Sequence, residues 1–218
     1  MVVVNRKILL PAIFIVVFAL SRIPGLMPWN FSVAYAFAFC EGVFFPGRRT
    51  WWLPLAVILA TDIGLNFYYQ HKLPEADVWS SANLANLAFN YVAYGVLIFL
   101  GRRFKPQTSL LNLVGGGILG AILFYFITNT ASWLFNPFHN PEYTKTLTGW
   151  IIALTKGTGG YPSTWEFFRN TLLSGGIFTA LFGAVGKLTA ESPAEKNAGA
   201  REPAAAEETE AEPEESNA

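Results

Sequence analysis

Seven polar side chains stand out because they fall within stretches of sequence that are otherwise apolar. Two are arginines, one is an aspartate and four are asparagines: Arg22, Asp62, Asn66, Asn90, Asn129, Arg169 and Asn170. An arginine guanidinium offers a bidentate fork that suits a carboxylate or a phosphate. An aspartate binds an amine or a proton, or orients an arginine, and asparagine amides bind hydroxyl or amide edges. These residue types predict a substrate-binding site for a small polar molecule.

The stretch that carries Asp62, residues 51–69, indicates where such a site would lie. It contains no basic side chain and a single acid. A helix of this length spans about 28 Å, close to the ~30 Å hydrocarbon core of a bilayer. An aspartate near the middle of such a helix costs roughly 2.5–3.5 kcal/mol on insertion scales, so a partner must compensate for it.

Composition places the whole chain in the same class of protein. Of its 218 residues, 52% are hydrophobic and 14% are charged, against about 25% charged in soluble domains. We therefore predict an all-α polytopic membrane protein, a bundle of six transmembrane helices. The expected spans cover approximately residues 8–21, 30–45, 51–69, 82–100, 110–135 and 167–188.

Two apolar segments need a separate interpretation, the N-terminal run and a short piece near residue 150. Arg6 and Lys7 precede the first apolar run as in a signal peptide, but the run ends at Arg22 without a small-residue cleavage site. We expect it to remain as an uncleaved first span. The apolar piece 150–154 is too short to cross, which indicates an interfacial or re-entrant helix that could cover a pocket.

The charge distribution predicts the orientation of the chain. Residues 1–190, the expected transmembrane domain, carry thirteen Lys/Arg and six Asp/Glu, and residues 191–218 carry two Lys/Arg and nine Glu. Basic residues cluster in short segments on the side of the N-terminus, so the positive-inside rule places both termini in the cytoplasm. The tail 191–218 has no Leu, Ile, Val or aromatic residue, and we expect it to be disordered and cytoplasmic.

This orientation brings most of the polar side chains to one depth. Five spans carry hydrogen-bonding groups in their outward halves, including Asn83, Asn86 and Asn90 on one helix face, while Glu41 lies toward the cytoplasmic end. Lipid cannot satisfy such groups, so they should face one another or a wet cavity open to the outside. The alternative is that the amides only join helices, and that Asp62 forms a structural ion pair with Arg22 or Arg169.

Several chemistries have no support in the sequence. One cysteine, Cys40, and two histidines provide no metal-ligand constellation and no disulfide framework. Nucleotide-binding glycine loops and hydrolase motifs are absent. We expect no cofactor, no enzymatic activity and no nucleic-acid partner.

Short motifs in a fixed order resemble a family of bacterial integral membrane proteins of unknown function. They are Ser21-Arg22-Ile23-Pro24, Asn30-Phe31, the run from Leu53-Pro54-Leu55 to Asp62, Thr128-Asn129, and the segment 167–173. The likeness covers about residues 8–188. One departure is Ser174-Gly175-Gly176, where that pattern often has an acid.

That family is similar to the substrate-binding S components of energy-coupling factor transporters. The resemblance implies six helices, a substrate captured from outside, and a separate transmembrane coupling subunit with ATPases. S components carry a small-residue ladder on the first helix for docking. In residues 8–21 the ladder would have only the small residues Ala12 and Ala19. The face Gly176, Ala180, Ala184 would have to take its place in docking the coupling subunit.

Our leading hypothesis is the substrate-binding subunit of a small-molecule importer in the bacterial inner membrane, a vitamin-like compound or another metabolite being the cargo. One rival is a structural or assembly membrane protein whose polar layer is helix-packing glue. Another is a stand-alone proton-coupled transporter that uses Asp62 and Glu41.

Overall fold

The computed structural model describes residues 6–45, 47–73 and 77–189, in which helices are joined by loops. These residues contain seven helices and no strand. The helices are α1 (Arg6–Ser21), α2 (Ala34–Phe44), α3 (Arg49–Lys72), α4 (Ser81–Gly101), α5 (Leu110–Phe135), α6 (Leu147–Thr155) and α7 (Thr164–Thr189). The all-α prediction is confirmed, and α6 contains the short apolar piece expected not to cross.

Four helices are long and apolar enough to cross a membrane. The corresponding runs are Thr50–Lys72, Ser81–Gly101, Leu110–Phe135 and Thr164–Leu188. α1 and α2 are apolar but have only 16 and 11 residues, or about 24 and 17 Å of helix. Six full-length spans are therefore not observed. The expected disordered tail, residues 191–218, lies outside the described residues.

The short helix α2 occupies the centre of the bundle. Every residue from Ala34 to Val43 is buried, and α2 packs against α1, α3, α4, α5 and α7. A helix that is apolar on all sides must be enclosed by other elements or by lipid. α2 is enclosed by protein, and its phenylalanines join Phe14 and Phe18 of α1 in the main hydrophobic core.

Glycine permits the closest helix contacts around this core. Gly42 of α2 lies against Gly101 of α4, where a Cβ on Gly42 would come within 3.0 Å of the Gly101 Cα. A Cβ on Gly116 would meet the rings of Phe39 and Phe104, and one on Gly120 would meet Leu97. Gly116 and Gly120, four residues apart on α5, thus serve helix packing. Gly176 lies on the side of α7 that meets Ile118 of α5.

Serine and threonine caps define the helix starts. Ser80, Ser109 and Thr146 each accept a hydrogen bond from a backbone N–H three residues later, at 3.3, 3.2 and 3.1 Å. Before α7, Ser163 Oγ accepts from the Glu166 N–H at 3.4 Å and bonds the Glu166 carboxylate at 3.2 Å. Ser163 and Glu166 have the S-x-x-E spacing of a capping box, although here the carboxylate accepts from the Ser163 hydroxyl rather than from its backbone N–H.

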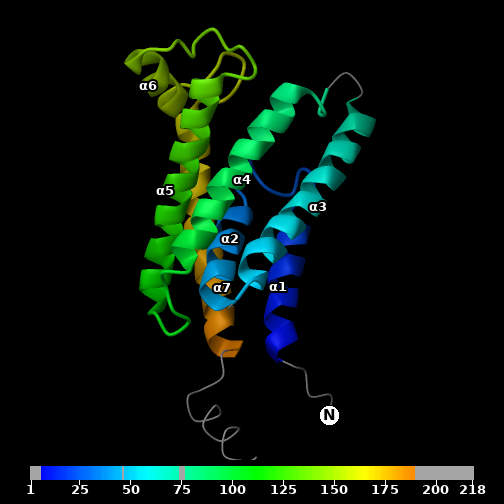
Figure 1. Ribbon diagram of the computed structural model, residues 1–218, viewed down its shortest axis with the longest axis vertical. Coiled ribbons are helices and arrows are strands. Elements are labelled where there is room, and N and C mark those ends of the chain that lie inside the picture. Colours follow the sequence, from blue (N-terminus) through cyan, green and yellow to red (C-terminus); the bar gives the residue numbers. More distant parts are fainter. Residues whose placement is uncertain (1–5, 46, 74–76, 190–218) are drawn as a thin grey trace, which may run out of the picture.

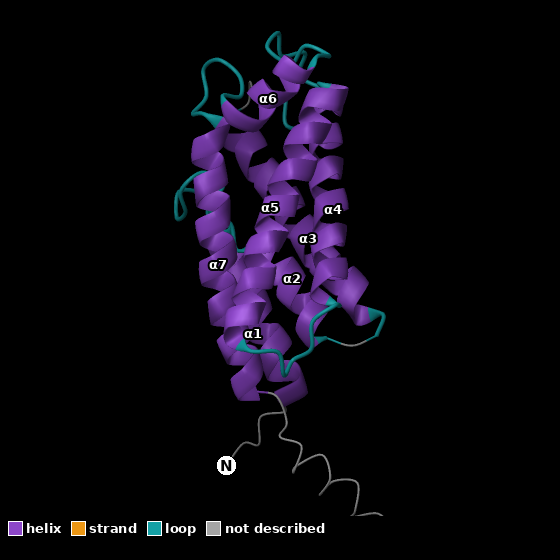
Figure 2. Ribbon diagram, turned by 90° about the vertical axis from the view of Figure 1, so that its left-hand side faces the viewer, coloured by secondary structure: helices purple, strands orange, loops and turns teal. Residues whose placement is uncertain are grey.

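The bundle has two distinct ends. α1 begins and α7 ends at one end, which we call the terminal end, and α6 lies at the opposite end, the α6 end (Figure 1). Figure 2 shows the same separation from the side. α1 and α2 stop below the upper ends of α3, α4 and α5 (Figure 1). The connector that joins α1 to α2, residues 22–33, therefore turns at a level below the upper ends of these longer helices.

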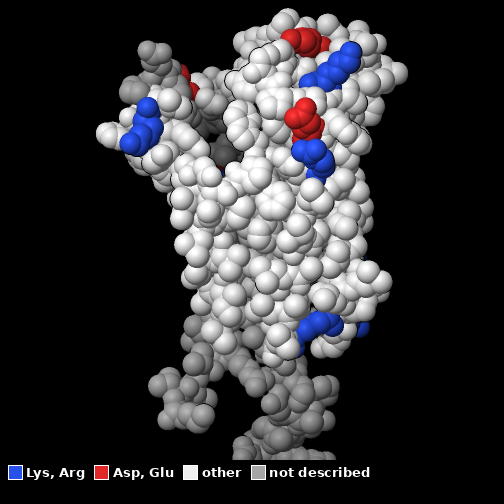
Figure 3. Space-filling view, turned by 180° about the vertical axis from the view of Figure 1, so that it is seen from behind, with Lys and Arg blue, Asp and Glu red and all other residues white. Residues whose placement is uncertain are grey.

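The outer surface suits a lipid environment. Large apolar side chains are exposed along the long helices, among them Trp52 and Phe67 of α3, Val92 of α4, Leu119 of α5 and Ile177 of α7. On the face drawn in Figure 3, the charged side chains lie near the two ends and a wide uncharged band separates them. Such a band is typical of an integral membrane protein.

Candidate functional site

A polar cavity lies in the half of the bundle nearer to the α6 end. Its volume is about 580 Å³, within the range of roughly 300–1,000 Å³ that holds small-molecule ligands. The helical residues that line it include Tyr69 near the end of α3, Asn86 near the start of α4, and Ser132 near the end of α5. A hollow is visible in the same half of the molecule (Figure 3).

The connector 22–33 contributes much of the lining because α1 and α2 are short. Arg22, Trp29, Asn30 and Ser32 all line the cavity. Pro24, Gly25 and Pro28 prevent the helix from continuing, and Gly25 adopts a φ of +82° that favours glycine. The connector therefore places backbone groups and polar side chains on the cavity wall, at a level that α1 and α2 do not reach.

Arg22 and Asp62 form an ion pair beside this cavity. The Arg22 guanidinium donates to the Asp62 carboxylate, and the Tyr91 hydroxyl donates to the other Asp62 oxygen at 2.9 Å. The Arg22 and Asp62 side chains are 24% and 11% exposed. The compensating partner that Asp62 requires is thus Arg22, and Arg169 is not involved.

The predicted asparagines divide into two groups. Asn90 and Asn129 line the cavity. Asn66 is half-buried on α3 and does not line the cavity. Asn170 is also outside the lining, but its side-chain amide donates to the Trp29 carbonyl at 2.9 Å and so holds the connector against α7.

Arg169 is one of the predicted site residues that the structure places outside the cavity. Its side chain is exposed and does not line the cavity. Of the seven predicted residues, the structure therefore places Arg22, Asn90 and Asn129 on the cavity wall. It places Asp62 directly behind Arg22, and Asn170 behind Trp29.

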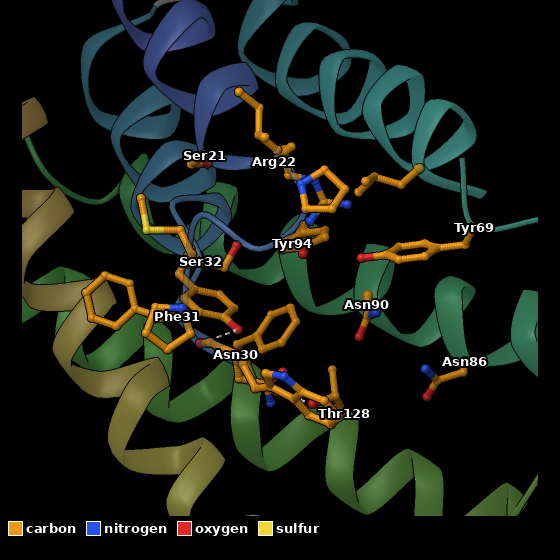
Figure 4. Close-up of a pocket in the computed structure, with 18 of the residues that line it drawn as sticks. Ser21, Arg22, Asn30, Phe31, Ser32, Tyr69, Asn86, Asn90, Tyr94 and Thr128 are labelled. Atoms are coloured by element: carbon orange, nitrogen blue, oxygen red, sulfur yellow. Dashed lines mark hydrogen bonds between the residues drawn. The ribbon is translucent and has the colours of Figure 1, made fainter. Parts of the chain in front are cut away.

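The cavity amides differ in what remains available for a ligand. Asn129 donates to the carbonyl of Tyr125 on its own helix at 2.8 Å, and the hydroxyl of the neighbouring Thr128 donates to Phe124 at 2.9 Å. Asn86 and Asn90 make no hydrogen bond to any described residue. Figure 4 shows both on the α4 side of the cavity, opposite Tyr69.

Aromatic residues complete the wall, and sequence reasoning did not select them. Tyr69, Tyr94 and Phe124 line the cavity, and Tyr91 bonds to Asp62. Helical spacing could have identified two of them, since Tyr69 is seven residues after Asp62 and Tyr94 is four after Asn90. In Figure 4 the rings of Tyr69 and Tyr94 lie toward the same space as Asn90.

The connector 136–163 does not cover the cavity in this structure. Trp150 on α6 donates to Thr130 Oγ1 at 3.0 Å, Trp133 donates to the Thr144 carbonyl at 2.7 Å, and Tyr125 donates to the carbonyl of Leu154. These contacts fasten α6 and the segment before it to α5, and no α6 residue lines the cavity. The sequence-based expectation of a lid over the site is therefore not met by α6.

A second polar group is buried in the core, away from the cavity. The Glu41 side chain on α2 is fully buried, and neither carboxylate oxygen has a hydrogen-bond partner among the described residues. Phe37 and Phe45, four residues away on either side, contact Phe18 and Phe14 of α1. Glu41 does not pair with Arg48. The described residues contain no group of three or more His, Cys, Asp or Glu side chains close enough to hold a metal ion.

An all-helical protein with four long apolar helices and a polar cavity among them belongs to the class of integral membrane proteins. The chain is a member of a family of unknown function (DUF6580), which matches residues 3–196. No curated protein and no solved structure matches the chain.

Proposed function

We propose that the protein is the substrate-binding subunit of a small-molecule importer. The observation that carries this proposal is the cavity of about 580 Å³ lined by Arg22, Asn86, Asn90 and Asn129. It opens in one half of an otherwise apolar bundle, and the buried helix α2 fills the other half. A polar space of this size among membrane-spanning helices suits the capture of a hydrophilic molecule.

The proposed topology has both termini in the cytoplasm and the cavity facing outward. α1 and α2 together enter and leave from the terminal end, so they count as a pair, and α3, α4, α5 and α7 cross completely. Basic residues support this orientation. Arg48, Arg102, Arg103, Lys105 and Lys187 are at or near helix ends of the terminal end, where Arg102 lies over the Trp51 ring at 5.4 Å and Lys187 reaches the Gln107 carbonyl at 3.4 Å.

The energy for import would come from partner proteins. The sequence has no nucleotide-binding loop and no nucleophile–base set, so we assign no enzymatic activity and no cofactor to this chain. By the resemblance to S components, we propose a transmembrane coupling subunit with ATPases as partners and the bacterial inner membrane as location. Of the small-residue face Gly176, Ala180, Ala184, which we propose as the docking surface for the coupling subunit, Gly176 also lies against Ile118 of α5.

Thermal unfolding of variants distinguishes this function from that of a structural protein. Asn90→Ala should lower the melting temperature little, because Asn90 bonds no other described residue, yet it should remove stabilisation by a bound ligand. Asn66→Ala is the matched control, since Asn66 lies outside the cavity. If Asn90→Ala causes a large loss of stability and no compound stabilises the wild type, the polar layer is helix-packing glue.

A stand-alone proton-coupled transporter is a second candidate, and Glu41 favours it. A carboxylic acid without a partner is costly in a dry core, and such residues within membrane proteins commonly serve proton transfer. Purified protein in vesicles, without ATPase partners, tests this function. Uptake driven by an imposed pH gradient and lost in Glu41→Gln would establish it; no uptake would leave the subunit model in place.

A further inference from the structure

We infer that the ligand of this cavity is an uncharged planar molecule whose edge carries neighbouring N–H and C=O groups, as in an aromatic amide. The inference rests on the proposed function, because it specifies the class of ligand for the same cavity. Three properties of the wall support it: balanced charge, free amide groups on one helix face, and aromatic rings around them.

The charges at the cavity are already paired. Arg22 is the one charged side chain among the described lining residues, and its guanidinium is bound to Asp62. An anionic ligand would have to compete with Asp62, which Tyr91 holds in place at 2.9 Å. A cationic ligand would meet Arg22 rather than Asp62, which lies behind it. In this partly desolvated space, the charge of an anionic or a cationic ligand would therefore have no compensating partner.

The free amides define the polar edge of the ligand. Asn86 and Asn90 are one helical turn apart on α4 and so lie on the same face. Both are half-buried and make no hydrogen bond to a described residue. Each side chain offers one carbonyl acceptor and one NH₂ donor. Two such groups side by side match a ligand that carries a donor and an acceptor next to each other.

The rings define its shape. Tyr94 and Phe124 have ring centroids 5.1 Å apart, Tyr35 and Phe124 4.7 Å apart, and all three line the cavity. Tyr69 and Trp29 add exposed rings from α3 and the connector. Flat aromatic faces favour a planar ligand that can stack on them.

Ligands of equal size and different charge test this class. Benzamide, benzoate and benzamidine share one ring and are neutral, anionic and cationic at pH 7. In purified protein held in nanodiscs, we expect millimolar benzamide to raise the melting temperature, and the two ions to bind about tenfold more weakly. Dimethylation of the benzamide nitrogen removes the donor and should abolish the shift. The double variant Asn86→Ala/Asn90→Ala should lose it, and Asn66→Ala should keep it.

A charge variant adds a test that does not depend on the amides. Asp62→Asn retains one oxygen that can accept from Arg22 and turns an NH₂ group toward the Tyr91 hydroxyl, which can accept from it, but it leaves the Arg22 charge unbalanced. We expect the ratio of benzoate to benzamide affinity to rise by about tenfold. An unchanged ratio would overturn the argument from paired charges.

The outcomes separate the ligand class from the proposed function. If benzoate or benzamidine binds wild type as well as benzamide does, and binding requires Asn90, the class is wrong and the site remains. If benzamide stabilises the double asparagine variant as it does wild type, the assignment of the amide edge is wrong. If none of these compounds binds wild type or Asp62→Asn, the class is wrong; the proposed function fails as well only if Asn90→Ala also causes a large loss of stability.

Discussion

The Tyr91 hydroxyl donates a hydrogen bond to Asp62 at 2.9 Å, while the Arg22 guanidinium occupies the other oxygen of the same carboxylate. This one acid therefore joins the end of α1, the middle of α3 and the middle of α4. Toward the α6 end, the Phe67 ring of α3 also contacts Trp79, with the ring centroids 5.4 Å apart. The ion pair and its tyrosine form a polar joint between α3 and its neighbours, in addition to the packing of α3 against α2 and α4.

Removal of the Asp62 carboxylate should destabilise the fold strongly. Asp62→Ala leaves the Arg22 charge unpaired in a largely buried position, which costs about 3–5 kcal/mol in comparable cases. The double variant Arg22→Met/Asp62→Leu removes both charges and should recover most of that loss. Unfolding in detergent, followed by circular dichroism, measures both. Equal stability of Asp62→Ala and wild type would contradict the structural role of the pair.

Tyr91→Phe isolates the hydrogen bond within this joint. It deletes one hydroxyl that donates to a charged acceptor, which stabilises a fold by roughly 1.5–3 kcal/mol. Tyr68→Phe is the matched control, because Tyr68 is an exposed tyrosine of α3. We expect the melting temperature to fall in Tyr91→Phe and to stay unchanged in Tyr68→Phe. The same change in both variants would mean that the Tyr91 hydroxyl adds nothing to the stability of the fold.

Two glycines of α4 should respond to alanine in opposite directions. A Cβ on Gly101 would overlap the carbonyl oxygen of Phe39 in α2, so Gly101→Ala must push two backbones apart and should cost about 1–3 kcal/mol or more. A Cβ on Gly95 meets nothing within 4 Å, and Gly95→Ala should add roughly 0.5–1 kcal/mol through helix propensity. Melting temperatures of both variants, measured side by side, check the sign of each effect.

Replacement of the buried acid should stabilise the core. Glu41→Met keeps the length of the side chain and removes two buried oxygens that have no described partner, each costly to desolvate. We expect the free energy of unfolding to rise by about 1–3 kcal/mol. Thr179→Val removes a second buried unpartnered oxygen and should have the same sign with a smaller size. A fall in stability for Glu41→Met would indicate a partner outside the described residues.

The orientation is tested by labelling single cysteines. Gln107 lies in the connector between α4 and α5 at the terminal end, and Tyr161 is 66% exposed near the α6 end. A membrane-impermeant maleimide should label Tyr161→Cys in intact cells and Gln107→Cys only after permeabilisation. Cys40 is buried, so background labelling should be low. The reverse pattern would invert the topology.

Sequence reasoning located the helices because apolar runs and caps are local signals. Ser109 and Ser163 fix the starts of α5 and α7 through bonds to residues three positions later, which can be recognised in the sequence. The expected span 8–21 agrees with α1 except that α1 begins two residues earlier, whereas α2 begins four residues later and ends one residue earlier than the expected span 30–45. Hydropathy shows that residues 30–45 are apolar, but it does not distinguish a helix facing lipid from α2, which is enclosed by other helices.

The site was predicted in part for a similar reason. Arg22, Asn90 and Asn129 could be found from their cost in an apolar span, whereas Tyr69 and Tyr94 are ordinary residues of membrane helices. The role of Asn170 depends on the connector, because its partner is the backbone carbonyl of Trp29. A contact between residues 141 positions apart arises from tertiary packing and leaves no local pattern.

The enclosure of α2 has a consequence for the path of any captured molecule. Below the cavity the interior is filled by Phe14, Phe18, Phe37 and Phe39, which are fully buried, and no side-chain rotation would open a passage through them. Delivery to the cytoplasm would require whole helices, or the entire protein, to move relative to the bilayer, on the microsecond-to-second scale of such rearrangements. Without such a movement, a molecule bound in the cavity can leave only on the side away from these phenylalanines, which is the side from which it entered.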